Sequence, residues 1–358
     1  MIPNHRQLRL TPCPHCPTCP VREDCGESRT EYACPEQYVP LEKGGPDIMD
    51  PRRPDLGLRL ADCGGLDLNA VAQRQDLPSL PPYIPCVLPR LFLQGALDYP
   101  AVAVPLNAVV SDKAFSVQRG TNLRRRLGLL PSTKLILLGF GDDKLLENIW
   151  PRRHSVIAGI SALSFDLVTA FDYSLWYDDT RLEHRYNLVR SLRTYELLQQ
   201  HGIPAIPHIY WFNQIDLDDW CTWLHLNQAV TMISIDLQCC DYPEDWHVML
   251  KGLEYLESNA PTYLSYLISG VAYGEQGARI PALLSAIPRL HLTNLDPYVK
   301  AVHGYETVYT EGYVQRRKSF DPRLDIFMRE VQKMQALVSR PPHARPLVRQ
   351  DAMMSLTI

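Results

Sequence analysis

The sequence contains no long apolar run and no strong excess of charge of either sign. No stretch approaches the ~18 consecutive apolar residues that a membrane-spanning helix needs, and the first residues, MIPNHRQLRL, lack the apolar stretch of a signal peptide. The net charge is −4, which argues against a uniformly basic nucleic-acid-binding protein and leaves only local basic patches for that role. Arg124 to Arg126 and the run from Arg316 to Arg349 are two such patches. We therefore expect a cytoplasmic protein that does not enter a membrane.

The cysteines lack the spacing of a disulfide framework. Five of the ten are scattered: Cys63, Cys86, Cys221, Cys239 and Cys240. Such scatter indicates a reducing compartment. The other five lie between positions 13 and 34, in CPHCPTCPVREDC followed by Cys34.

This cysteine-rich segment has the spacing of metal ligands. Its candidate ligands are Cys13, Cys16, Cys19 and Cys25, with Cys34 as a spare or replacement. Two residues between ligands is the span over which a tight turn directs both sulfurs at one ion. Repeated Cys-x2-Cys is the usual iron-sulfur ferredoxin arrangement, and residues 16 to 25 resemble the cluster loop of iron-sulfur DNA glycosylases. Because zinc knuckles often begin Cys-Pro-x-Cys, a [4Fe-4S] cluster and Zn²⁺ remain equal alternatives.

Proline and the apolar pattern divide the chain into regions. Residues 1–99 are rich in proline, and PSLPPYIPCVLP, near 78 to 89, is too rich for a regular helix or a central strand. We expect a β/α domain over 100–305, a helical extension over 306–340 and a disordered tail over 341–358. Within the extension, Pro322 to Ser339 has the pattern of one amphipathic helix.

Eight short apolar runs predict the strands of an α/β protein, because they alternate with amphipathic segments such as Leu182 to Gln200 and Trp246 to Glu257. The runs are AVAVPLNAVV (101–110), KLILLGF (134–140), SVIAGIS (155–161), DLVTAFDYS (166–174), IPAIPHIYW (203–211), AVTMISIDL (229–237), TYLSYLISGV (262–271) and RLHLTNL (289–295). Eight runs favour a (β/α)8-like barrel, either closed or incomplete.

Polar side chains gather at the carboxyl ends of these runs, where the active sites of parallel barrels lie. They include Asp172, Tyr173, Ser174, His208, Trp211, Asp236, Glu275 and Asn294. Carboxylates with a histidine suit general acid–base chemistry, covalent attack or binding of a divalent ion. Asp172 and Asp236 are the strongest candidates, since each ends a strongly apolar strand where an unpartnered carboxylate is costly to bury.

Several segments resemble, in order and spacing, a family of bacterial, phage and mobile-element proteins that is catalogued as domain of unknown function 4417. The segments are FGDDKLLENIW (140–150), FDYSLWYDD (171–179), YNLVR (186–190) and GIPAIPHIYW (202–211). The resemblance spans roughly 135 to 275. It includes Asp172, Ser174, Asn187, Arg190 and Trp211, whereas His208 stands where that family usually has asparagine.

A second resemblance points to chemistry. DLVTAFDYS is similar to the strand of tRNA-guanine transglycosylases that ends in Phe-Asp, and ISGVAYGE (268–275) is similar to their glycine-rich Ala-x-Gly-Glu segment. The resemblance implies that Asp172 binds the guanine edge and that Gly270, Ala272, Gly274 and Glu275 line the base pocket. The motif of the nucleophilic aspartate in that family has no clear counterpart here.

Together these features favour a nucleic-acid-modifying barrel enzyme of the transglycosylase type, which exchanges or cleaves at a purine base. In that hypothesis Asp236 is the nucleophile or base, His208 moves a proton, and Tyr173 or Trp211 stacks on the base. One alternative is a non-catalytic mobile-element binding module that is stapled by metal. Another is a Mg²⁺-dependent phosphodiesterase that uses the acidic ring. The sequence leaves the oligomeric state open.

Overall fold

The structure is a computed structural model of the chain. It describes residues 62–88, 97–117, 122–175, 181–240, 242–271, 279–310 and 313–339. The chain divides into two compact units. The first comprises Met1–Leu77, Pro105–Gly120 and Leu137–Ser234, and the second comprises Pro78–Val104, Thr121–Ile136 and Ile235–Ile358. The predicted metal knuckle at 13–34 and the tail at 341–358 lie outside the described residues.

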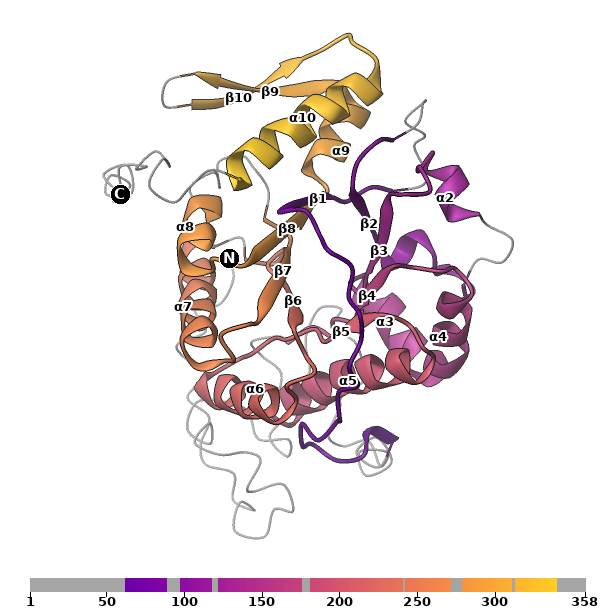
Figure 1. The fold of residues 1–358 in the computed structure, drawn as a ribbon, viewed down its shortest axis with the longest axis vertical. Helices are drawn as coiled ribbons and strands as arrows, with labels where there is room; N and C mark the ends of the chain where they lie inside the picture. The colour runs from indigo at the N-terminus through magenta and orange to yellow at the C-terminus, as the bar shows by residue number, and fades with distance from the viewer. Residues whose placement is uncertain are drawn as a thin grey trace, which may run out of the picture. The chain divides into compact units, whose positions relative to one another are not determined.

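The protein is of the α/β class, with two four-stranded sheets (Figure 1). One has the order β2-β3-β4-β5, formed by Ala101–Pro105, Lys134–Leu138, Leu167–Thr169 and Ala205–Ile206. The other has the order β1-β8-β7-β6, formed by Tyr83–Pro85, Leu290–Asn294, Ser265–Ser269 and Met232–Asp236. The pairs β4–β5, β7–β8 and β1–β8 are parallel. Nearly all strand residues are buried, as expected where both faces of a parallel sheet are covered.

Two of the isolated parallel bridges connect a residue just after one strand to a residue of another strand. In the second unit Cys86, just after β1, pairs with Ala103 of β2, and Val87 N–H donates to the Ala103 carbonyl at 2.9 Å. In the first unit His208, just after β5, pairs with Ser234 of β6. There Ile209 N–H donates to Ser234 O and Ser234 N–H donates to Pro207 O, each at 2.9 Å.

The helices of the first unit follow its strands. They are α3 (Asp143–Ile149), α4 (Arg153–Ser161), α5 (Arg181–Gln200) and α6 (Gln214–Leu226), with single 3-10 turns at Leu106–Ala108 and Trp150–Arg152. The α5 helix is followed by Gly202 at a φ of +69°, a left-handed conformation that favours glycine. Asn213 caps α6, since its side-chain oxygen accepts the Asp216 N–H.

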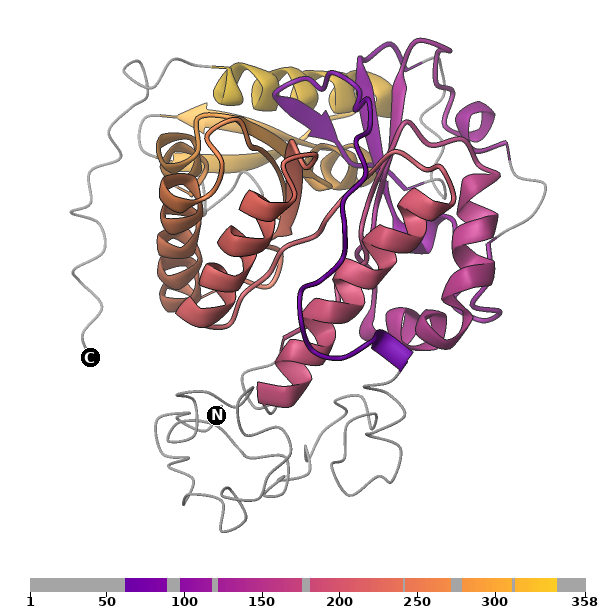
Figure 2. The ribbon, with the colours of Figure 1, turned by 60° about the horizontal axis from the view of Figure 1, so that its bottom comes forward.

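The second unit contains an antiparallel hairpin at its C-terminal end. Its helices are α2 (Leu123–Arg126), α7 (Pro243–Asn259), α8 (Arg279–Ala286), α9 (Asp296–His303) and α10 (Arg323–Val338). The hairpin pairs β9 (Tyr305–Thr310) with β10 (Tyr313–Lys318). Figures 1 and 2 show the hairpin, α9 and α10 as neighbours. Gly304, at a φ of +69°, ends α9 and lets the chain turn directly into β9.

Seven of the eight apolar runs contain a strand, but the prediction for residues 155–161 was wrong. That run lies in α4, where Val156, Ile157 and Ile160 are buried. Their spacing places them on one side of a helix, and a seven-residue apolar run does not by itself distinguish a strand from a buried helix.

The eighth strand, β1, lies instead in the proline-rich segment near 78 to 89. The ladder on β1 avoids the proline nitrogens: Leu292 N–H donates to Pro82 O at 2.8 Å, and Cys86 N–H donates to Asn294 O at 2.9 Å. Because the hydrogen bonds use carbonyls and the N–H groups of other residues, Pro85 fits within this strand. The segment therefore contains a strand, at one end of the order β1-β8-β7-β6.

The C-terminal extension matches its prediction in part. The helix expected from Pro322 to Ser339 is α10, Arg323–Val338, whereas the hairpin of β9 and β10 was not anticipated. Leu182 to Gln200 and Trp246 to Glu257 correspond to α5 and α7. Among the helices of the described residues, none is both long enough and apolar enough to span a membrane.

Candidate functional site

In the first unit the structure brings Asp172 and His208 together. Asp172 follows β4, and its N–H donates to Gly139 O, just beyond β3, at 3.0 Å. His208 follows β5, the parallel neighbour of β4. Nε2 of His208 lies 3.1 Å from Oδ1 of Asp172, and the two side chains are 5% and 19% exposed. A carboxylate and an imidazole thus meet at the carboxyl ends of adjacent parallel strands.

The histidine is held from its other side by the next strand. Nδ1 of His208 lies 3.3 Å from Oγ of Ser234 on β6, and this hydroxyl also donates to Pro207 O at 3.3 Å. The backbone bridge between His208 and Ser234 fixes the ring further. A histidine oriented through one ring nitrogen and facing a carboxylate with the other can transfer a proton in a defined direction.

Gly139 allows the end of β3 to approach the end of β4, which precedes Asp172. A Cβ at Gly139 would clash with the backbone of Thr169 and Ala170 at the end of β4. Only glycine therefore permits this close approach of the two strand ends.

The residues after Asp172 are anchored to α3 and α5. Oγ of Ser174 donates to Oδ1 of Asp143 at 2.6 Å, and Asn187 donates to the Ser174 carbonyl at 2.7 Å. Burial raises the pKa of Asp143, and the hydrogen bond from Ser174 opposes this rise. Ser174 therefore has a positioning role for the loop that carries Asp172.

Tyr173 is buried beneath a cation. The guanidinium carbon of Arg190 lies 4.0 Å from the centre of the Tyr173 ring, and Trp150 meets the same ring edge-on with 5.8 Å between the ring centres. Arg190 also donates two hydrogen bonds of 2.6 Å to the carboxylate of Glu147. Burial raises the pKa of Tyr173 well above its ordinary value, so the phenol stays protonated. The stacking role of Tyr173 stays a prediction.

In the second unit Asp236 pairs with a serine on the neighbouring strand. Oδ1 of Asp236, the last residue of β6, accepts a 2.7 Å hydrogen bond from Oγ of Ser269, the last residue of β7. Gln238 N–H lies 3.3 Å from the same oxygen. Gly270 has a φ of +88°, and a Cβ there would clash with the backbone of Gln238. Gly270 therefore allows the segment after β6 to pass close to the end of β7.

Asn294 connects three segments of the second unit. Its Oδ1 accepts from the Tyr83 hydroxyl of β1 at 2.9 Å, and its Nδ2 donates to Val271 O, just after β7, at 2.7 Å. This gives Asn294 a structural role at the end of β8.

Of the other predicted site residues, only Trp211 lies in the part of the chain that the structure describes. Trp211 is buried and stacks on Tyr210, with 6.0 Å between ring centres. Gly274, Glu275 and the five ligand candidates between Cys13 and Cys34 lie outside the described residues. Within the described part of the chain, no three His, Cys, Asp or Glu side chains are grouped as a metal site.

Two contributing residues were not identified from the sequence, namely Ser234 and Ser269. Each is a buried polar position inside an apolar run. A hydroxyl in a buried strand needs a partner, which is the one signal that points to either serine.

The fold and these strand-end pairs define an α/β protein with parallel sheets and an acid–histidine pair at their carboxyl ends. Residues 124–272 match the family described as "Domain of unknown function (DUF4417)". None of the curated proteins matches the chain. The family match confirms the first predicted resemblance over the matched range. The range contains Asp172, His208 and Asp236. The resemblance to tRNA-guanine transglycosylases and the association with phages and mobile elements stay predictions.

Proposed function

We propose that the protein is an enzyme that acts on a purine base of nucleic acid, exchanging or cleaving at that base, and that His208, beside Asp172, carries its proton transfers. The observation that supports this most is the 3.1 Å approach of His208 Nε2 to Asp172 Oδ1 at the ends of two adjacent parallel strands. Such a pair suits a proton donor and acceptor, since the carboxylate stabilises the imidazolium that forms when His208 accepts a proton.

We choose a purine as the substrate because residues 166–174 and 268–275 are similar to base-binding segments of transglycosylases. In base exchange a nucleophile forms a bond to the sugar carbon C1′ as the bond from C1′ to the base breaks. The departing base takes the bonding electrons and a proton, and the incoming base loses a proton before it attacks. We assign the proton steps to His208, the edge of the base to Asp172 and the nucleophilic attack to Asp236.

We also propose that the strands continue into a (β/α)8-like barrel. β1 and β6 end one strand order, and β2 and β5 end the other. The bridge of Cys86 with Ala103 extends β1 toward β2, and the bridge of His208 with Ser234 extends β5 toward β6. Both bridges are parallel, as barrel closure requires. Strand ends that carry polar groups would then belong to the site-bearing face of a barrel.

The alternatives have less support. The Mg²⁺-dependent phosphodiesterase gains none from the geometry of the described residues, which contain no grouped set of metal ligands. The non-catalytic binding module predicts that no turnover is found, so an activity assay separates it from the enzyme.

The test measures uptake and release of radiolabelled guanine by tRNA, single-stranded DNA and duplex DNA with purified full chain. Loss of a positioned acid–base group costs about 10²- to 10⁴-fold in rate, so Asp172→Asn and His208→Gln should each lose at least a hundredfold. Asp142→Asn is the matched control, because Asp142 stands at the start of α3 and its side chain makes no capping hydrogen bond.

The melting temperature of each variant shows whether lost activity reflects unfolding. A folded Asp172→Asn protein with the full rate would remove this pair from the mechanism. Absence of base uptake and release by the unaltered protein on all three substrates would refute the proposed reaction.

A further inference from the structure

The hairpin of the second unit carries a row of exposed cations. Arg316, Arg317 and Lys318 of β10 are all exposed. Because side chains alternate along a strand, Arg316 and Lys318 lie on the same face. Tyr305 of β9 stands directly opposite Lys318 and is 39% exposed. Just beyond β10, the ring of Phe320 is 90% exposed, and its centre lies 5.4 Å from Nζ of Lys318.

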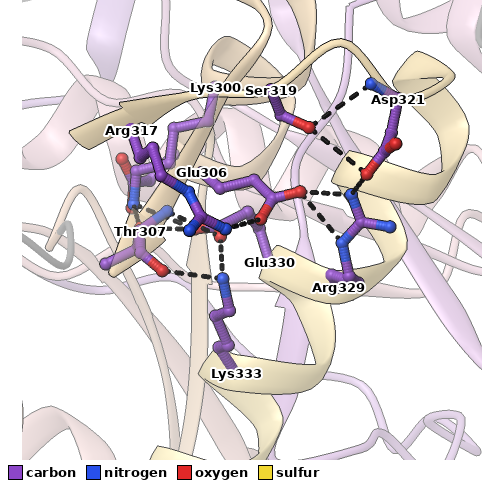
Figure 3. Close-up of polar contacts among 10 residues, drawn as sticks. Lys300, Glu306, Thr307, Arg317, Ser319, Asp321, Arg329, Glu330 and Lys333 are labelled. Carbon is purple, nitrogen blue, oxygen red and sulfur yellow. Dashed lines mark hydrogen bonds and ion pairs between the residues drawn. The ribbon is translucent and has the colours of Figure 1, made fainter. Parts of the chain in front are cut away.

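The neighbouring carboxylates are occupied within the protein (Figure 3). Glu306 pairs with Arg329 of α10, and Glu330 pairs with Lys300 at 3.2 Å and Lys333 at 2.6 Å. Both glutamates are buried. By contrast, neither Arg316 nor Lys318 forms an ion pair within the described residues. Arg316 and Lys318 are thus exposed, whereas Glu306 and Glu330 are engaged within the protein.

The same buried network holds the hairpin on α10. Oε1 of Glu330 accepts the Thr307 N–H at 2.9 Å, and Nζ of Lys333 donates to Thr307 O at 2.8 Å (Figure 3). These contacts use both the backbone N–H and the carbonyl of Thr307, and they hold β9 against α10. Since β10 pairs with β9 over six residue pairs, the exposed cations project from a supported element.

We propose that Tyr305, Arg316, Lys318 and Phe320, here called the hairpin surface, bind single-stranded nucleic acid. Phosphates attract exposed arginine and lysine, and an exposed aromatic ring beside a cation provides a platform on which a base stacks. An acidic protein would use the cations but would have no use for an aromatic ring that is 90% exposed. The inference rests on the proposed function only for the choice of polymer, because it concerns a different element and a binding step.

The test is equilibrium binding of short fluorescein-labelled single-stranded DNA and RNA to the full chain, followed by anisotropy at several salt concentrations. Loss of two phosphate contacts should reduce the slope of log K against log salt by about 1.4 for a single strand. We expect this from the double variant Arg316→Gln/Lys318→Gln. Phe320→Ala should weaken binding about tenfold and leave the slope unchanged. All three residues are exposed, so their substitution should not unfold the protein.

The matched control is Arg125→Gln/Arg126→Gln on α2, which removes the same charge from another basic cluster. Loss of binding in this control alone, with the hairpin variants unaffected, would overturn the proposal. So would equal binding of poly-glutamate together with an unaltered affinity of Phe320→Ala for nucleic acid. Asp142→Asn, at an exposed position outside both the hairpin surface and the proposed site, should bind as the unaltered protein does. Binding that depends on the hairpin surface in a protein that neither takes up nor releases base would support this surface while refuting the proposed reaction.

Discussion

Arg190 is the residue on which the surroundings of Asp172 most depend. Its side chain is 1% exposed, pairs with both oxygens of Glu147 and covers the ring of Tyr173, the residue next to Asp172. Burial opposes the charge of Arg190, but the attraction of Glu147 outweighs it and leaves the pKa of the guanidinium raised. The arrangement needs a planar cation that can form two parallel hydrogen bonds and stack on an aromatic ring at once.

Lysine in place of Arg190 can neither form two parallel hydrogen bonds to Glu147 nor stack as a planar group on Tyr173. We expect Arg190→Lys to lower the free energy of unfolding by about 1 to 3 kcal/mol, because lysine keeps the charge but leaves part of the buried hydrogen bonding to Glu147 unmade. Chemical denaturation measures this, with Arg152→Lys, an exposed position, as the matched control that should change by less than ~0.5 kcal/mol. Equal stability of the two variants would show that the Glu147 pair contributes little.

Individual site residues were only partly predictable from the sequence. Asp172, His208 and Asp236 were predicted because each lies near the carboxyl end of an apolar run, and the carboxyl ends of parallel strands are where such groups meet. Their partners were not found, since a serine such as Ser234 or Ser269 looks like any other small residue in a strand. Which carboxylate meets the histidine depends on strand order, and the sequence does not specify that order.

At the scale of elements, the apolar pattern predicted long segments correctly and did not identify short ones. The 20-residue α5 and the 16-residue α10 show a sustained helical pattern. The seven-residue apolar run at 155–161 does not, and the three-residue β1 is too short for any pattern. The hairpin was not predicted because β10 ends in exposed charged residues. This strand therefore lacks the apolar face by which strands are usually identified.

The element most open to direct test is the predicted knuckle at 13–34. Thiolates at this spacing should bind about one zinc ion or one [4Fe-4S] cluster per chain. Elemental and sulfide analysis of protein purified without oxygen distinguishes the two. Cys16→Ser should release the metal, because it removes one of four ligands, whereas Cys239→Ser, at an exposed cysteine away from the knuckle, should retain it. Intact protein with neither zinc nor iron would contradict the prediction.

At the scale of the whole molecule, the division of residues between the two units falls within individual strands. The first three residues of β3 belong to the second unit and the last two to the first, and β6 is divided in the same way between Ser234 and Ile235. If the strands also close into a barrel as proposed, neither unit retains a complete sheet when the other unfolds. Both units should then unfold in one cooperative transition.

Calorimetry with one variant in each unit tests this expectation. Arg190→Lys weakens the first unit. Glu330→Gln weakens the second because the buried Lys300 and the half-buried Lys333 lose a charged partner, at a cost of about 3 kcal/mol. Asp321→Asn, with a carboxylate that is 58% exposed, is the control for the second unit. We expect a single transition whose calorimetric and van't Hoff enthalpies agree, and we expect both variants to shift it to lower temperature. Two transitions, with each variant shifting only one of them, would show that the units fold independently and would refute the closed barrel.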